Sequence, residues 1–453
     1  MSIKENNPQV TDYPTIFREM TTFVPQLGVD RTFKNSGAVS GPENPKWILG
    51  QTLYEIYVRA FSDGGTFNQV TKRLSNLKEL GFNVLWFMPV YPIGKQNRKG
   101  SMGSPYAVRD YFTVNPEYGS EEDFKHLIRQ AHSLGMHVII DMVPNHVAAD
   151  FKELKENPDL VVRDARGEPT RRIKDWTDIT DLDYSNPKTR EFMRRVMRFW
   201  IEAFDVDGYR VDVAGMVPLD FWRQVIPELR SLKNDFYLLA EWESPSLHEA
   251  GFNSTYDWST LTIFRKVLQG KVKASFLADW ILTKSAIYPQ NSLPLRFIEN
   301  HDYPRSAQTF PGEQLYAALT LMFTLHGIPL IYNGQEIGAE HQPSLFEREP
   351  IDWQHADTRV LNRIKQLISL RAKETAMQSA NYLFYDDALN QGILAFNKDT
   401  KLRVLINLTD LKQPLPPDLI SDIEAIVFDS RSKAHLNGNL TTLEPYQALI
   451  CTL

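Results

Sequence analysis

Three carboxylic acids, Asp212, Glu241 and Asp302, stand at the ends of three short segments that the sequence predicts as strands. Two neighbouring carboxyl groups can cleave a glycosidic bond with retention, because one attacks the anomeric carbon while the other protonates the leaving oxygen. Arg210 precedes Asp212 by two residues and so points to the same side of the strand, where its charge would keep that carboxylate ionised. The residues around Glu241 are apolar, and such surroundings raise the pKa of a carboxyl group as a general acid requires.

The elements that would position these acids follow a repeated strand–loop–helix pattern. Short, mostly apolar segments predict eight strands, at residues 52–57, 84–88, 138–142, 208–212, 237–241, 254–256, 295–299 and 329–332. Helical spacing of apolar residues predicts helices at 67–80, 121–134 and 188–204, the third with Ser185 as its cap and Pro187 in its first turn. Alternation of this kind is typical of an α/β protein, here a (β/α)8 TIM barrel over residues 49–374, whose active site lies at the carboxyl ends of the strands.

Three further regions flank or interrupt the predicted barrel. Residues 1–48 lack periodicity and are interpreted as an N-terminal extension packed on the barrel. Residues 147–184 make the connection after the third strand too long for a plain loop, which predicts an inserted domain. Residues 375–453 contain short alternating runs and predict a C-terminal antiparallel β-sandwich domain.

Composition narrows the classes of partner. The formal net charge of −6 argues against a nucleic-acid or anionic-membrane partner, and no run of residues is long and apolar enough for a membrane span. Cys451 is the only cysteine, so no intrachain disulfide can form. The polar N-terminal segment has no signal-peptide pattern, so a cytoplasmic location is expected. The oligomeric state has no sequence signal.

Six blocks of the sequence, in one order, resemble the α-amylase family of glycoside hydrolases (family 13), of the intracellular α-amylase or maltooligosaccharide hydrolase type. They are the three blocks around the carboxylates together with 103–111, 141–146 and 327–336. The resemblance implies that Asp212 is the nucleophile, Glu241 the general acid and base, and Asp302 the stabiliser of the transition state.

The same resemblance implies a set of substrate-binding residues: Tyr106, Asp110, His146, Arg210, His301 and Arg348. Tyr106 would stack under a sugar ring, the two histidines would donate hydrogen bonds to that sugar, and Asp110 would position Tyr106 and its loop. Arg348 would either reach a sugar on the donor side or pair with one of its glutamate neighbours, Glu347 and Glu349.

Two features of the sequence concern the acceptor subsites and the binding of calcium. Gly215 and Met216 replace the Lys-His pair that many α-amylases carry after the nucleophile, so the acceptor subsites should differ. The chemistry needs no cofactor, but a structural calcium ion is a possibility of the family. Its ligands would be Asn145, the carbonyl of Met216, and either Asp175 or Asp183; alternatively, Asn145 only forms hydrogen bonds.

The leading hypothesis is a retaining hydrolase of α-1,4 bonds in α-glucans or maltooligosaccharides. An α-glucosidase, an oligo-1,6-glucosidase and a 4-α-glucanotransferase remain open because they use the same three carboxylates. Val213, directly after the nucleophile, is similar to the residue in α-1,6-cleaving relatives, but a small residue there can equally serve packing. A non-catalytic binding barrel is disfavoured, because such proteins typically lack one or more of the carboxylates, and all three are present.

Overall fold

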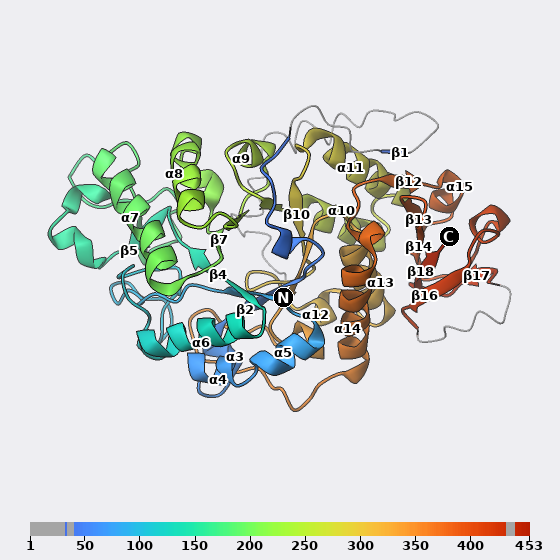
Figure 1. The fold of residues 1–453 in the computed structure, drawn as a ribbon, viewed down its shortest axis with the longest axis horizontal. Helices are drawn as coiled ribbons and strands as arrows, with labels where there is room; N and C mark the ends of the chain where they lie inside the picture. The colour runs from blue at the N-terminus through green and yellow to red at the C-terminus, as the bar shows by residue number, and fades with distance from the viewer. Residues whose placement is uncertain (1–31, 34–39, 432–439) are drawn as a thin grey trace.

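A closed barrel of eight parallel strands forms the body of the molecule (Figure 1). The structure is a computed structural model, and it describes residues 32–33, 40–431 and 440–453. The barrel strands are β2 (Leu53–Ile56), β3 (Val84–Phe87), β4 (His137–Met142), β7 (Gly208–Val211), β8 (Tyr237–Ala240), β9 (Ser254–Tyr256), β10 (Leu293–Arg296) and β11 (Ile328–Tyr332). Nearly every residue in them is buried, because the barrel interior covers one face of each strand and helices cover the other. The predicted barrel is therefore confirmed.

One strand differs from the prediction in position. The seventh barrel strand ends at Arg296, whereas the sequence pattern placed it at 295–299. The chain leaves the sheet before Glu299, because the carboxylate of Glu299 binds the Arg305 side chain at 2.7 Å and the backbone N–H of Ser306 at 2.6 Å. His301 and Asp302 consequently lie in a turn beyond the strand end.

Helices surround the barrel and connect its strands. They are α3 (Val58–Phe61), α4 (Phe67–Thr71), α5 (Leu74–Leu80), α6 (Glu121–Ser133), α7 (Pro187–Phe204), α8 (Leu219–Leu232), α9 (Pro245–Glu249), α10 (Trp258–Leu268), α11 (Ala274–Ile287), α12 (Ser306–Thr309), α13 (Glu313–Thr324) and α14 (Thr358–Lys373). Short 3-10 turns stand at η1 (Lys46–Ile48), η4 (Ala214–Met216), η5 (Gln335–Ile337) and η6 (Thr375–Gln378).

Two helical predictions need correction. The helix predicted over 67–80 is split into α4 and α5. Between them the backbone N–H of Arg73 donates a hydrogen bond of 2.8 Å to the carbonyl of Val70, three residues earlier, which makes a tight turn. The cap of α7 is Asn186, whose side chain accepts a hydrogen bond from the backbone N–H of Lys188. The predicted cap, Ser185, instead binds the Asp183 carboxylate.

The inserted segment is built on a short antiparallel hairpin. In it β5 (His146–Ala148) pairs with β6 (Ile179–Asp181), so that His146 lies opposite Asp181. Two 3-10 turns, η2 (Lys152–Lys155) and η3 (Pro158–Leu160), lie between these strands. The hairpin begins four residues after β4 ends, which fixes the inserted segment next to the carboxyl end of the barrel.

The C-terminal region is antiparallel, as predicted. Its main sheet has the order β1-β12-β13-β14-β18-β16, and β15 pairs with β17 in a separate small sheet. The strands are β1 (Thr32–Phe33), β12 (Tyr382–Phe384), β13 (Ile393–Lys398), β14 (Leu402–Asn407), β15 (Gln413–Pro414), β16 (Ala425–Asp429), β17 (Thr442–Leu443) and β18 (Ala448–Thr452). The helix α15 (Asp386–Asn390) and the 3-10 turn η7 (Pro417–Leu419) complete the region.

The two faces of that main sheet belong to different cores. Residues such as Leu394 and Ile406 on one face join the core of the barrel, while Ala395 and Leu405 on the other face form a separate core with the small sheet. This alternation follows the two-residue period of a strand. It seats the C-terminal sheet against the outside of the barrel, away from the carboxyl ends of β7 and β8 (Figure 1).

Most of the predicted N-terminal extension lies outside the described residues. Within the described part, β1 pairs with β12, and Trp47 stacks on His137 at the start of β4 with ring centroids 4.2 Å apart. The domain boundaries placed at residues 48 and 374 stay predictions. Among the described residues, none of the helices combines the length and apolar character that crossing a membrane requires.

Candidate active site

Arg210 is the centre of a buried cluster at the carboxyl ends of three adjacent barrel strands. Its guanidinium contacts Asp141 at 2.9 Å, Asp212 at 3.1 Å and Glu241 at 2.8 Å. These residues belong to or directly follow β4, β7 and β8, which are neighbours in the barrel. The guanidinium also lies 5.2 Å from the ring centre of Trp86, so that indole is part of the core beneath the site. One cation therefore holds the predicted nucleophile and the predicted acid close together.

Burial changes the protonation of these acids. Asp141, Asp212 and Glu241 are almost completely covered, and burial raises the pKa of each, while the Arg210 charge opposes that rise. For Glu241 the charges of Asp212 and of Asp302 add to the increase. One guanidinium cannot neutralise three carboxylates, so the three acids together tend to retain a proton at neutral pH.

Asp212 keeps one oxygen free. Arg210 binds its Oδ1, whereas its Oδ2 has no hydrogen-bond partner among the described residues. His146 lies on that side, with its Nε2 atom 3.9 Å from Oδ2. A carboxylate fixed through one oxygen and open at the other can attack an electrophile in the pocket.

Both oxygens of Glu241 are occupied. Oε1 contacts Arg210, and Oε2 accepts a hydrogen bond of 2.8 Å from the backbone N–H of Val213. Val213 has φ +36° and ψ +47°, a left-handed conformation that costs a β-branched residue energy. The sharp turn after the predicted nucleophile thus aims an N–H at the predicted acid.

A second chain of contacts links Glu55 on β2 to the sugar-binding residues predicted from sequence. Glu55 binds Nδ1 of His301, and Nε2 of His301 lies 2.7 Å from the hydroxyl of Tyr106. That hydroxyl donates to Asp141 at 3.1 Å, which closes the chain onto the Arg210 cluster. Burial opposes protonation of His301, but Asp302 and Glu55 outweigh it and raise its pKa to about 9. His301 is therefore positively charged at neutral pH.

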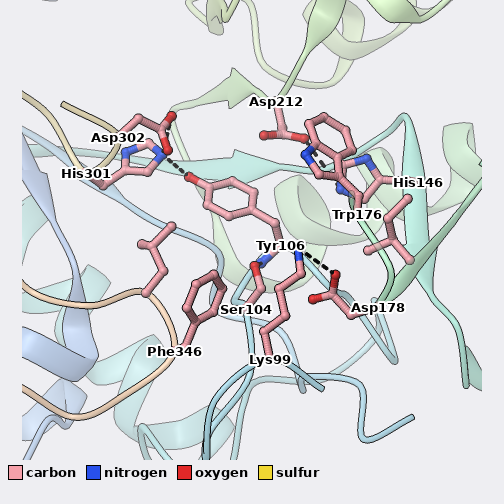
Figure 2. Close-up of a pocket in the computed structure, with 12 residues that line it drawn as sticks. Lys99, Ser104, Tyr106, His146, Trp176, Asp178, Asp212, His301, Asp302 and Phe346 are labelled. Atoms are coloured by element: carbon pink, nitrogen blue, oxygen red, sulfur yellow. Dashed lines mark hydrogen bonds and ion pairs between the residues drawn. The ribbon is translucent and has the colours of Figure 1, made fainter. Parts of the chain in front are cut away.

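A pocket opens above this cluster (Figure 2). Its lining residues are Lys99, Ser104, Tyr106, His146, Trp176, Asp178, Ile179, Asp212, His301, Asp302, Leu345 and Phe346. The Tyr106 ring stands in the middle, with His301 and Asp302 on one side and Asp212, His146 and Trp176 on the other (Figure 2). Lys99 and Asp178 form an ion pair of 3.5 Å that connects two of the walls. The cavity has a volume of about 140 Å³.

The predicted site residues fall into three groups. Five line the pocket: Tyr106, His146, Asp212, His301 and Asp302. Arg210 and Glu241 lie beneath the lining, where Glu241 is 1% exposed. Asp110 and Arg348 are not pocket-lining residues.

The two outlying residues make other contacts. Asp110 binds Lys152 of the inserted segment at 3.0 Å and the backbone N–H of Phe112, so it joins two loops. Arg348 pairs with Glu117 at 3.3 Å. The alternative that Arg348 pairs with Glu347 or Glu349 was wrong, because those glutamates bind other groups. Contact of Arg348 with a donor-side sugar stays a prediction.

The oxygens predicted as calcium ligands are already in contact with a cation of the protein. The Asn145 side-chain oxygen and the Met216 carbonyl both accept hydrogen bonds from Arg172. The acid at this place is Asp181, which was not the one predicted. Asp183, one of the two predicted acids, binds the hydroxyl of Ser185.

The other departure from the family pattern also has a structural counterpart. Gly215 lies flat against the indole ring of Trp242, so that a Cβ atom added there would fall inside the ring's van der Waals surface. A lysine at this position could therefore fit only if Trp242 moved. The ring of a residue adjacent to the predicted acid takes the space where many α-amylases carry a lysine.

Sequence reasoning missed several residues of this site. Glu55 had a usable signal, because a carboxylate in an otherwise apolar strand needs a buried partner. Lys99, Trp176, Asp178 and Phe346 had none, since they lie on loops whose spacing carries no period. Their approach to the pocket depends on the tertiary fold.

The site has carboxyl groups paired across one guanidinium, at the carboxyl end of a barrel and under a pocket with aromatic and histidine walls. This arrangement is compatible with a glycosidase. Comparison with known proteins agrees. A family model described as "Alpha amylase, catalytic domain" matches residues 30–178 and 173–380, so the chain belongs to the α-amylase family. It is a glycoside hydrolase that cleaves α-glucans.

Three relatives show how far the similarity extends. An α-amylase from Lactobacillus plantarum has 32% sequence identity and a TM-score of 0.79, covering 90% of this chain and 99% of that one. A noncanonic maltogenic α-amylase, AmyB from Thermotoga neapolitana, has 31% identity and a TM-score of 0.77, covering 89% and 98%. Alpha-amylase 3 from Dictyoglomus thermophilum is 28% identical over an alignment of 355 residues, and the match covers 68% of this chain and 68% of that one.

Proposed function

We propose that the protein hydrolyses α-1,4 bonds of maltooligosaccharides with retention, through Asp212 as nucleophile and Glu241 as acid and base. The observation that carries this proposal is the single guanidinium of Arg210, which contacts both carboxyl groups below the pocket. A double displacement needs two carboxyl groups that are close enough to act on opposite sides of one bond.

In the first step, the free Oδ2 of Asp212 attacks the anomeric carbon, and the bond from that carbon to the glycosidic oxygen breaks. The proton of Glu241 passes to the leaving oxygen. For this transfer the Glu241 carboxyl must leave its contacts with Arg210 and the Val213 N–H. Without the Arg210 charge beside it, the Glu241 carboxyl holds its proton more tightly until the leaving oxygen accepts that proton.

In the second step, the Glu241 carboxylate takes a proton from water. The water oxygen attacks the anomeric carbon, the ester bond to Asp212 breaks, and both carboxyl groups return to their starting forms. If a sugar hydroxyl replaces water, the same step transfers the glycosyl group, so a hydrolase and a transferase differ only in the acceptor.

Asp302 and the two histidines act on the sugar held between these carboxyl groups. Asp302 lines the pocket, and its carboxylate lies 3.3 Å from Nε2 of His301. His301 can therefore donate hydrogen bonds to sugar hydroxyls, and the neighbouring Asp302 carboxylate can accept them. Burial lowers the pKa of His146 to about 4, so His146 is neutral at neutral pH. The face of the Tyr106 ring in the pocket offers a stacking surface for the C–H face of a pyranose.

The test is incubation with maltoheptaose, with products separated by chromatography and their anomeric configuration followed by NMR. We expect α-configured maltose and maltotriose as the first products. First products in the β configuration would contradict the double displacement. Glucose alone, or chains longer than seven units, would keep the mechanism and reject the maltooligosaccharide hydrolase in favour of a glucosidase or a transferase.

A further inference from the structure

Arg172 of the inserted segment lies across the junction between that segment and the barrel. Its guanidinium donates hydrogen bonds to the side-chain oxygen of Asn145, to Asp181 Oδ2 at 2.8 Å, and to the Met216 carbonyl at 3.2 Å. Asn145 follows β4, Asp181 ends β6 and Met216 ends η4 after β7. One side chain therefore connects three elements that are far apart in the sequence.

Two of the three residues whose oxygens Arg172 contacts are buried, while Arg172 itself is not. Asn145 and Asp181 are 1% and 2% exposed, whereas the Arg172 side chain is 53% exposed. The guanidinium thus covers these oxygens from the solvent side. A buried carboxylate that loses its cation is left uncompensated, and this is strongly destabilising. The backbone N–H of Arg172 also binds Asp181, at 3.0 Å, which fixes the chain at this point.

An amide oxygen, a carboxylate oxygen and a backbone carbonyl are also the types of ligand that calcium takes in proteins. A guanidinium offers five donors in a fixed fork, so it can satisfy the same three oxygens without a metal. Among the residues that the structure describes, no group of three or more His, Cys, Asp or Glu side chains is placed to hold a metal ion.

We propose that the Arg172 guanidinium is the resident cation of this junction and takes the place of a structural calcium ion. The donor set is complete with the arginine present, so the protein does not require calcium for its stability. The effect on turnover described next rests on the proposed function; the effect on stability does not.

The arginine reaches the catalytic cluster through two residues. The Asn145 side-chain amide nitrogen lies 3.1 Å from Nδ1 of His146, while its oxygen is held by Arg172. An amide nitrogen donates, so Nδ1 accepts and the ring proton of His146 lies on Nε2, which faces Asp212 Oδ2 at 3.9 Å. Arg172 is accordingly a positioning residue, which fixes the orientation and tautomer of His146.

The first experiment measures the melting temperature of the unmodified protein in EDTA and in millimolar Ca²⁺. We expect the two values to agree, because the arginine already occupies the oxygens. A lower melting temperature in EDTA, or a higher one in Ca²⁺, would overturn the proposal. This measurement needs neither substrate nor a variant, so it is independent of the proposed function.

The second experiment compares Arg172→Ala with Arg171→Ala, which removes the same charge one residue away. The Arg171 side chain donates to the Lys174 carbonyl within the same loop, at 3.2 Å. We expect Arg172→Ala to melt about 3–5 °C lower and to lose about tenfold in kcat with little change in KM. Arg171→Ala should change neither.

Adding Ca²⁺ to the Arg172→Ala variant then tests whether the arginine fills a site for a cation or only forms hydrogen bonds. In Arg172→Ala the three oxygens are exposed to solvent, so Ca²⁺ should raise the melting temperature of that variant alone. Arg172→Lys should retain most of the stability in EDTA, because its charge remains. A melting temperature of Arg172→Ala equal to that of Arg171→Ala, or unchanged by Ca²⁺, would contradict the proposal.

Discussion

Two buried clusters of charge lie side by side at the carboxyl ends of the barrel strands, and Glu241 and Glu243 belong to different ones. In the catalytic cluster the acids are Asp141, Asp212, Glu241 and Glu55, and the cations are Arg210 and His301. In the other cluster the acids are Glu243 and Asp257, and the cations are Lys284 and Arg296. Burial is nearly complete in both.

The difference lies in the balance of charge. In the second cluster each acid has a cation, so the charges balance, and Glu243 also accepts a backbone hydrogen bond of 3.0 Å from Ser259. In the catalytic cluster the acids outnumber the cations, and burial raises the pKa of Glu241 and Asp212. A buried cluster with excess acid retains a proton that it can transfer, whereas a balanced one stabilises the fold.

The largest expected effect is the loss of activity when an acid of the catalytic cluster is made neutral. Asp212→Asn and Glu241→Gln should each lower kcat/KM on maltoheptaose by at least about 10⁴-fold, because a double displacement needs both groups. Neither should lower the melting temperature, since each removes a charge from a cluster that has too many. A variant that retained more than a tenth of the activity would remove that residue from its proposed role.

Changing the balanced cluster should have the opposite result. Lys284→Met leaves Glu243 without its cation and should cost about 3 kcal/mol of the free energy of unfolding. Its kcat/KM should remain near that of the unmodified enzyme, because Lys284 contacts none of the catalytic acids in the described structure. Denaturant unfolding and initial rates provide the two measurements. A large fall in activity without a fall in stability would show that the clusters are not functionally separate.

The pH dependence of activity sharpens the same contrast. Turnover needs Asp212 ionised and Glu241 protonated, so kcat/KM should rise as Asp212 loses its proton and fall as Glu241 loses its own. Burial raises both pKa values, so both limbs should lie above the range near pH 4 where free carboxyl groups titrate.

The matched control for this profile is Glu241→Gln with a glycosyl fluoride, whose leaving group needs no proton. The fall in rate at alkaline pH should vanish in this variant, while the rise at acid pH remains. Persistence of the alkaline limb would assign it to another group.

The smallest expected effect on activity comes from removing one tyrosine hydroxyl beside each of the two clusters. Tyr106→Phe removes the group that joins Asp141 and His301, and should lower kcat/KM by about tenfold, equal to about 1.4 kcal/mol. Tyr288→Phe, beside the balanced cluster with Lys284 at 5.2 Å from its ring centre, should leave kcat/KM unchanged. Equal effects of the two substitutions on initial rates would contradict the distinction.

The barrel and the position of its main acids could be predicted because both depend on local pattern. Apolar strands buried on both faces recur at regular intervals, and Asp212 and Glu241 directly follow two of them. Parallel strands place their carboxyl ends together, so residues on separate strands must meet. The exact end of β10 was harder, since Glu299 has its partner six residues further on, in a turn that has no period.

The remaining parts of the site depend on contacts between distant segments. Glu55 and His301 are 246 residues apart, and only closure of the barrel brings them together. Arg172, Trp176 and Asp178 lie on the inserted segment, where neither strand nor helical spacing indicates which side chains turn inward. Sequence spacing could propose Asn145 as a calcium ligand, but not that Arg172 would already fill that place.

The most direct test of the catalytic assignment is to trap the intermediate. The protein would be incubated with a fluorinated α-maltosyl fluoride, which forms the glycosyl-enzyme readily but slows its hydrolysis, and then digested and analysed by mass spectrometry. We predict one glycosylated peptide, with the sugar attached to Asp212. A sugar attached to any other residue, or β-configured first products from maltoheptaose with no adduct at all, would contradict the account.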